Sequence, residues 1–371
     1  MDLLYLANLR LPTEKAHGIQ IAKMCEAFSD QGVNVTLVSP TRASPIKENL
    51  FSFYNLRDNF KFVSIPAADF YFPGFLDRLS FHIKSFLSAK KLSDYARKNN
   101  PDVVYSREEL SLIFLKKIPS TIVYEAHKFS FLKRPLYGLL LRRKARIIAL
   151  TEGLKREFTN LGFSERDVIV APDGVDFNKF AINVSKAEAR TKIGLPLDKK
   201  IALYSGSTLR WKGLDTFERA SKFLPDINFV VVGGNYTGVK ENLHYLGYQL
   251  HSKIPFYLKS ADILVLPNRK DERISRLYTS PMKLFEYMAS GRPIVASSLP
   301  SIKEVLDHET SVLVKPDDPQ ALAEGIKIIL QNNDLAEKIS ANAFQKVNNF
   351  TWQARVDKII RFISNENINL I

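Results

Sequence analysis

Short apolar runs alternate with amphipathic helical patterns along nearly the whole of this 371-residue chain. Runs of this length are typical of strands that are buried on both faces. Strands that alternate with helices predict a parallel sheet covered by helices. In the first half we predict helices at 19–30, 76–98 and 152–161, and strands at 3–7, 35–38, 62–65, 103–105, 122–124, 146–150 and 168–171.

The same pattern begins again after about residue 180. Helices are predicted at 214–223, 252–259, 281–290, 319–331 and 333–348, and strands at 201–204, 229–232, 263–266, 294–296 and 311–314. The fold class is therefore α/β, with two Rossmann-like domains facing across a cleft. We place them at 1–183 and 184–350, followed by a C-terminal helix at 351–371 that packs back toward the first domain. Ligands of such sheets bind at the carboxyl ends of the strands.

The composition agrees with a globular protein of two domains, with 45% hydrophobic and 25% charged residues. The net charge of +14 favours anionic partners, which include nucleic acid, acidic lipid headgroups and phosphorylated small molecules. No recognition helix or base-stacking motif is evident, so no nucleic acid is expected. The single cysteine, Cys25, lies in an apolar helical pattern and excludes a disulfide framework.

The start of the chain lacks the basic residues and long apolar core of a secretory signal. No run approaches the roughly 20 apolar residues of a membrane span. We expect a cytoplasmic protein that can lie at the inner face of the cell membrane.

The segment 278–293 is the strongest local motif. Ser280 can cap a helix whose first residue is Pro281, and Gly291 can end it. The free N–H groups at such a helix start suit a phosphate. Lys283 would add a mobile cation, and Glu286 on the same face could accept hydrogen bonds from ribose hydroxyls. The alternative is an ordinary capped helix with a surface ion pair.

The loop 206–213 is a second candidate, because it follows a predicted strand and precedes a helix. Gly206 lets the backbone approach a ligand, and Arg210 and Lys212 supply two cations. These features predict diphosphate binding, with a solvated basic loop as the alternative.

The loop 15–20 joins the first strand to the first helix, and Gly18 opens that helix. The dinucleotide fingerprint G-x-G-x-x-G is absent, which argues against a dehydrogenase. His127 and Arg107 each follow a predicted strand, and a lone histidine is more often structural than catalytic. We list His17 and Arg107 as candidates on the acceptor side.

No metal is expected, because the histidines have no metal-ligand spacing. Asp173 and Asp176 stand three residues apart around Gly174, which is typical of a turn.

The segment 128–146 contains seven basic residues and no acidic one. Leucine and aromatic side chains lie between the charges. Such a segment can dock on anionic lipid, or it can be a covering helix with a solvated face.

Together these motifs resemble the retaining glycosyltransferases of family 4, which have the GT-B fold. The resemblance runs along nearly the whole chain, in the family's order, and rests on the segments 13–20, 170–176, 211–213, 261–267 and 280–293. It is closest to a bacterial surface-polysaccharide subset with Ser-Pro-x-Lys-Leu-Phe-Glu-Tyr.

The resemblance implies transfer of a sugar from a nucleoside-diphosphate sugar to a glycan or lipid-linked acceptor, with retention and without a metal. The first domain would bind the acceptor and the second the nucleotide sugar. His127, Glu286 and Lys212 would be catalytic. The implied donor contacts are Gly18, Gly206, Arg210, Lys212, Ser280, Pro281, Met282, Lys283 and Glu286.

Two positions depart from the family's pattern. Tyr278 stands where a glutamate often contacts the transferred sugar, and Ser207 stands where an arginine is common. Two other functions stay open: a nucleotide-sugar epimerase, which has the same fold, and an inactive nucleotide-binding scaffold, which the departure at Tyr278 leaves possible.

Overall fold

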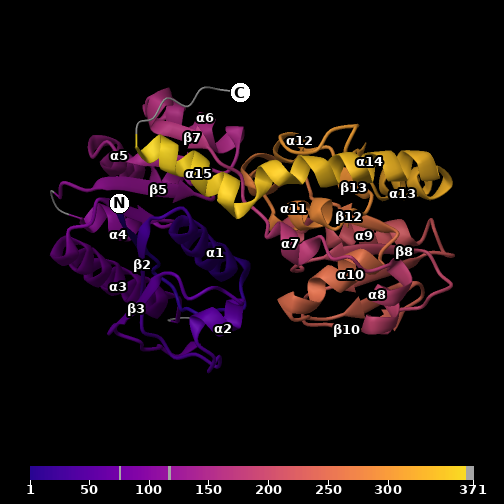
Figure 1. Ribbon diagram of the computed structural model, residues 1–371, viewed down its shortest axis with the longest axis horizontal. Coiled ribbons are helices and arrows are strands. Elements are labelled where there is room, and N and C mark those ends of the chain that lie inside the picture. The colour runs from indigo at the N-terminus through magenta and orange to yellow at the C-terminus, as the bar shows by residue number, and fades with distance from the viewer. Residues whose placement is uncertain (75–76, 116–117, 365–371) are drawn as a thin grey trace. The chain divides into compact units, whose positions relative to one another are not determined.

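The computed structural model describes residues 1–74, 77–115 and 118–364. The chain divides into two compact units (Figure 1). Unit 1 contains residues 1–150, residues 154–171 and the chain from Trp352 onward, and unit 2 contains residues 151–153 and 172–351. The chain thus enters unit 2 at Pro172, earlier than the expected boundary at 183.

The described residues of unit 1 form a seven-stranded sheet in the order β3-β2-β1-β4-β5-β6-β7. Every neighbouring pair is parallel, as expected for strands joined by helical crossovers. The five inner strands are buried along most of their length, whereas the edge strands β3 and β7 are more exposed. The strands are β1 Asp2–Leu6, β2 Asn34–Pro40, β3 Lys61–Ile65, β4 Val103–Ser106, β5 Thr121–Ala126, β6 Arg146–Ala149 and β7 Val168–Val170.

The last helix, α15, completes unit 1 and packs against α1, which confirms that the C-terminal helix returns to the first domain. Figure 1 shows it beside the strands of this unit. The expected starting residue of the helix 76–98, Leu76, lies outside the described residues, as do 365–371 of the C-terminal segment. The helices are α1 Ala16–Asp30, α2 Leu50–Tyr54, α3 Asp77–Asn99, α4 Glu109–Phe114, α5 Arg134–Arg142, α6 Glu152–Asn160 and α15 Trp352–Ile363.

Unit 2 repeats the architecture with the strand order β10-β11-β9-β8-β12-β13-β14 among its described residues. Only the edge strand β10 runs antiparallel to its neighbour. The β10–β11 hairpin was not predicted, because its polar, glycine-containing sequence lacks an apolar run. The strands are β8 Ile201–Ser205, β9 Asn228–Val232, β10 Thr237–Lys240, β11 Leu243–Leu246, β12 Ile263–Leu266, β13 Ile294–Ser297 and β14 Val312–Val314.

Several helices of unit 2 were not predicted. They include the short α-helices over Phe177–Phe180 and Pro300–Lys303, and α8, which begins with a capping box between Ser185 and Glu188. A π-helix over Ile274–Tyr278 was also not predicted. The α-helices are α7 Phe177–Phe180, α8 Lys186–Ile193, α9 Leu214–Ser221, α10 Ile254–Ser260, α11 Met282–Ala289, α12 Pro300–Lys303, α13 Pro319–Gln331 and α14 Asn333–Lys346.

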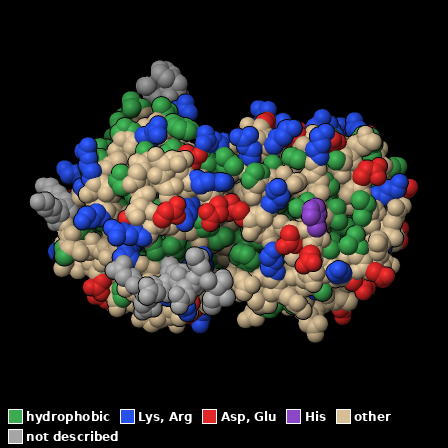
Figure 2. Space-filling model, turned by 90° about the horizontal axis from the view of Figure 1, so that it is seen from above, with side chains coloured by type: hydrophobic (Ala, Val, Ile, Leu, Met, Phe, Trp, Pro, Cys, Tyr) green, Lys and Arg blue, Asp and Glu red, His purple; other side chains and the backbone are tan. Residues whose placement is uncertain are grey.

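The described basic side chains do not gather in one patch on the face of the molecule that Figure 2 shows. On this face (Figure 2), Lys and Arg side chains are distributed over both units, with acidic side chains among them. Among the described residues, no helix combines the length and apolar character that crossing a membrane requires.

Candidate active site

The motif 278–293 forms α11, which follows β12 through a loop in unit 2. Pro281, not Ser280, occupies the cap position, and no side chain caps the helix start. The Ser280 hydroxyl instead accepts a hydrogen bond from the Asp173 amide at 3.0 Å. The predicted serine cap is therefore wrong, because this hydroxyl holds a neighbouring loop.

Lys283 lies in the first turn of α11 and is only 7% exposed. Its Nζ lies 4.0 Å from the centre of the Tyr204 ring and has no hydrogen-bond partner among the described residues. Burial and the nearby Lys212 hold the pKa of Lys283 well below its usual value, against the opposing effect of Glu286. The expected mobile cation is in fact a buried one.

Glu286 is also 7% exposed. Lys283 and Glu286 therefore do not form the surface ion pair that was the alternative to a ligand site. Oε1 of Glu286 lies 3.1 Å from Nε2 of His251. The Lys179 ammonium lies 2.9 Å from Nδ1 of the same ring. Because an ammonium only donates, Nδ1 accepts and Nε2–H donates to Glu286. His251 thus orients the carboxylate.

Gly206 lies directly after β8, with a left-handed φ of +138°. A Cβ at this position would lie 3.6 Å from Cδ of Lys283 and 3.8 Å from Nζ of Lys212. Burial lowers the pKa of Lys212, and Glu286 opposes that effect. The structure therefore brings Gly206, Lys212, Lys283 and Glu286 together at the carboxyl edge of the unit 2 sheet.

Arg210 does not join this group. Its side chain is 73% exposed and pairs with Asp271 at 3.1 Å. The sequence predicted two loop cations at one site, but only Lys212 lies beside Lys283.

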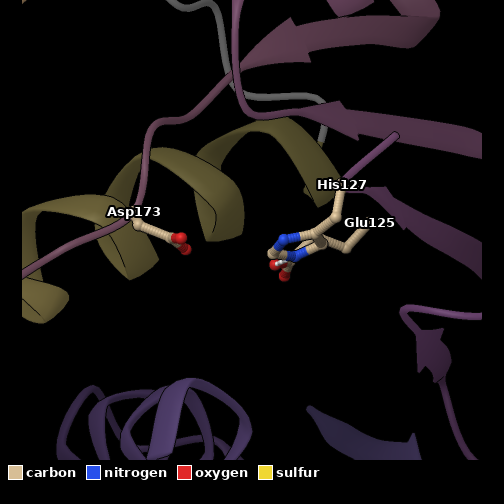
Figure 3. A group of neighbouring side chains, drawn as sticks. All are labelled: Glu125, His127 and Asp173. Atoms are coloured by element: carbon tan, nitrogen blue, oxygen red, sulfur yellow. Dashed lines mark hydrogen bonds and ion pairs between the residues drawn. The ribbon is translucent and has the colours of Figure 1, made fainter. Parts of the chain in front are cut away.

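In unit 1, the candidate His127 belongs to a network around Glu125, whose side chain is fully buried. Glu125 lies near the carboxyl end of β5, and His127 directly follows the strand. Figure 3 shows the imidazole against the carboxylate. The Glu125 carboxylate lies 2.6 Å from Nε2 of His127, and it accepts hydrogen bonds from Gln20, Tyr105 and Arg355.

The network fixes the state of the histidine. Burial raises the pKa of Glu125, but Arg355 and His127 outweigh it and hold that pKa well below the usual value. An ionised carboxylate only accepts, so Nε2 of His127 carries the proton and Nδ1 is an acceptor. Burial and Arg107 lower the pKa of His127 to about 4, so the ring is neutral at pH 7.

The predicted loop residues of unit 1 lie next to this network. Nη1 of Arg107 donates to Oε1 of Gln20 at 2.6 Å and to the His17 carbonyl at 3.4 Å. Burial and Arg107 lower the pKa of His17 to about 4. A Cβ on Gly18 would lie 2.1 Å from the Tyr54 hydroxyl, so the close packing of Tyr54 requires glycine there.

Two family models match the chain. "Glycosyltransferase Family 4" matches residues 18–179, and "Glycosyl transferases group 1" matches residues 185–346. The chain belongs to the family 4 glycosyltransferases.

Individual relatives agree with this family. The chain is 28% identical over 255 residues to a phosphatidyl-myo-inositol mannosyltransferase of Mycobacterium tuberculosis. It is 27% identical over 230 residues to a D-inositol 3-phosphate glycosyltransferase of Xylanimonas cellulosilytica. The matches cover 63% and 56% of this chain, and 62% and 53% of the relatives' own lengths.

Solved structures show that the fold is GT-B. A sucrose-phosphate synthase of Thermosynechococcus elongatus has a TM-score of 0.75 and 18% identity, with 98% of each chain covered. HepE of Anabaena, solved in complex with UDP, has a TM-score of 0.75 and 16% identity, with 98% of this chain and all of that chain covered.

The two departures from the family 4 pattern differ in their surroundings. Tyr278 ends the π-helix and is 2% exposed. Ser207 is exposed, and its carbonyl accepts a hydrogen bond from the Tyr204 hydroxyl at 2.7 Å. Tyr204 is the ring over which Lys283 lies.

Three residues of the two sites were missed from the sequence. Glu125 carried a signal, because a carboxylate in an apolar strand must be paired if it is buried. Arg355 and His251 carried no such signal. Nothing in the neighbouring sequence indicates that Arg355 reaches Glu125 or that His251 reaches Glu286.

Proposed function

We propose that this chain transfers a hexosyl group from a nucleoside-diphosphate sugar to a glycan or lipid-linked acceptor, with retention of anomeric configuration and without a metal. The proposal covers the donor, the acceptor and the mechanism, since the relatives align over little more than half of their length. Family membership and the site in unit 2 support it.

The observation that carries the proposal is the buried ammonium of Lys283, which lies beside Lys212 and has no hydrogen-bond partner among the residues that the structure describes. Burying a charge without a partner is costly, and a second cation nearby raises that cost. A diphosphate placed at Gly206 would pair with both ammonium groups. The open N–H groups at the start of α11 would add to this attraction.

The same groups suit the chemistry of the transfer. As the glycosidic bond to the diphosphate breaks, negative charge develops on the leaving group. Lys212 and Lys283 would stabilise that charge from positions that the fold fixes. Two ammonium groups supply the positive charge that a metal provides in other enzymes. Glu286, held by His251, would accept the ribose hydroxyls.

His127 would act as a hydrogen-bond acceptor toward the transferred sugar. Its Nδ1 carries no proton at neutral pH, because Nε2–H is committed to Glu125. The imidazole can therefore accept a hydrogen bond from a sugar hydroxyl, and Glu125 is the residue that positions it.

We also propose contact with an anionic membrane surface through residues 128–146. α5 buries Tyr137 and Leu140, so the segment is a covering helix, but it also exposes a mixed surface. Phe131 is 52% and Leu132 94% exposed, and the exposed cations around them are Lys128, Arg134, Arg142 and Lys144. Leu132→Glu would release the protein from vesicles that contain phosphatidylglycerol. Equal binding of both forms would contradict the membrane contact.

The donor is tested by thermal unfolding with UDP-, GDP-, ADP- and CDP-sugars and the free diphosphates. A ligand of the native state at a hundredfold excess over Kd adds about 2.7 kcal/mol of stability. A selective upward shift identifies the base, and an acceptor screen with the same donor then tests transfer. Interconversion of the donor sugar without any acceptor would instead indicate an epimerase. Binding without any turnover would indicate a scaffold, and no shift at millimolar ligand would contradict the donor site.

A further inference from the structure

Unit 2 contains a cavity of about 530 Å3 away from the donor residues. Its wall includes Lys200, Asp262 and Pro293, which directly precede β8, β12 and β13. These strands are parallel, so the cavity lies at the amino edge of the sheet. Gly206 follows the carboxyl end of β8, at the opposite edge.

Two cations of the cavity wall, Lys259 and Arg292, have no acidic partner among the described residues. Nζ of Lys259 donates to the Ser290 carbonyl at 3.3 Å. Nε and Nη2 of Arg292 donate to the Lys259 carbonyl at 3.0 and 2.7 Å. Burial and Arg292 lower the pKa of Lys259. Both side chains are thus hydrogen-bonded to neutral carbonyls, and the attraction of Arg292 to Asp262 does not outweigh the lowering of the Arg292 pKa by burial and Arg190.

The nearby carboxylate cannot compensate them, because Asp262 is already shared. It pairs with Arg190 at 2.6 Å, Lys186 at 2.5 Å and Lys200 at 3.7 Å. The wall carries four cations, Lys186, Lys200, Lys259 and Arg292, against the two carboxylates of Asp262 and Glu337. The cavity therefore has a positive surplus.

Most of the remaining wall is apolar, although Asn333 and Ser340 also line it. The apolar part comes from the end of α13 and from α14, and consists of Ile329, Leu330, Ala336, Ala341 and Phe344. Cavities of about 300–1,000 Å3 with an apolar lining and a few convergent polar groups are typical of small-molecule sites. This one combines a cationic side with an apolar side.

We infer that this cavity binds a phosphate monoester carried on a compact apolar body. The phosphate would lie between Lys259 and Arg292, where two charge-assisted hydrogen bonds are available. The apolar body would cover Leu330 and Phe344. The site is separate from the proposed donor site and does not rest on its assignment.

The test is calorimetric titration of the whole chain with phenyl phosphate, with UDP present at saturation to fill the donor site. Wild type should bind one equivalent. Lys259→Met and Arg292→Leu should each weaken binding about tenfold or more, the loss expected for one charge-assisted hydrogen bond. Lys222→Met, which removes an exposed lysine elsewhere in unit 2, should leave it unchanged.

The inference would be overturned if wild type did not bind millimolar phenyl phosphate, or if both cavity variants bound it as tightly as wild type does. If Arg292→Leu unfolds, Lys259→Met still tests it, because that side chain donates only to one carbonyl. Inorganic phosphate should bind more weakly than phenyl phosphate, and equal affinity would overturn the role of the apolar wall. Hexyl phosphate in the same titration distinguishes an alkyl from an aromatic body.

Discussion

Both units bury a charged side chain at a candidate site, but the two side chains differ in the partners that surround them. In unit 1, Glu125 is surrounded by donors from Gln20, Tyr105, His127 and Arg355. In unit 2, Lys283 is almost as deeply buried but has no hydrogen-bond partner in the described part of the chain, and the like charge of Lys212 affects its pKa more than the opposite charge of Glu286 does.

The difference separates a charge that organises the protein from one that we propose to bind a ligand. A fully paired buried group contributes to a defined arrangement of its neighbours. An unpaired buried group lowers stability until something of opposite charge binds. Unit 1 thus provides a fixed histidine, and unit 2 provides the buried lysine that we propose binds the diphosphate.

The largest expected effect is on turnover. Glu286→Ala removes the carboxylate proposed to hold the ribose, so the transfer rate with the donor that the thermal screen identifies should fall to about one per cent or less. The fold should survive, because Glu286 interacts mainly with His251. Glu324→Ala, an exposed position on α13, is the control. Turnover like that of wild type would contradict the donor site.

The paired charge predicts a large effect on stability. Arg355→Met leaves Glu125 buried without its cation, which should cost about 3–5 kcal/mol of unfolding free energy in urea. Arg361→Met on the same helix removes only an exposed ion pair, so it should cost less than about 1 kcal/mol. Adding Glu125→Gln to Arg355→Met should recover part of the loss. Equal losses of unfolding free energy in Arg355→Met and Arg361→Met would contradict the proposed role of Arg355 in neutralising the buried Glu125.

For the buried Lys283, we expect its removal to affect ligand binding and not the free energy of unfolding. Lys283→Met should not destabilise the unliganded protein, because it removes an uncompensated ammonium. It should weaken nucleoside-diphosphate binding about 10- to 100-fold by calorimetry, the loss expected for a hydrogen bond to a charged group. Lys222→Met serves as the exposed control. Unchanged affinity together with a large loss of stability would show that Lys283 is structural.

The smallest effect is a dependence on pH that belongs to unit 1. The pKa of His127 falls from 6.5 to about 4 on folding, so between these values the unfolded state binds more protons. Stability therefore decreases as pH falls through this window, by up to about 1.4 kcal/mol per pH unit. His127→Gln should lose this part of the slope, whereas His82→Gln at an exposed site should keep it. Identical slopes for His127→Gln and wild type would contradict the neutral histidine.

Much of the fold was predictable because parallel strands buried on both faces leave short apolar runs. The runs that gave β1 and β8 needed no tertiary information. The β10–β11 hairpin was missed because an edge pair can be polar, and α8 was missed because it buries only Ala189 and Arg190. At the sites, Lys283 and Glu286 were predictable as neighbours on one helix. Their burial was not, because it depends on Tyr204 and His251 from other elements.

The return of the chain to unit 1 has a consequence for how the protein is made. Glu125 and Arg355 are separated by 230 positions in the sequence. At a synthesis rate of 5–20 residues per second, this corresponds to about 10–50 seconds. During that interval all of unit 2 emerges, and unit 1 has its strands but not the guanidinium that neutralises its buried carboxylate. Unit 2 can therefore reach its native state before unit 1 does, although most of unit 1 is translated first.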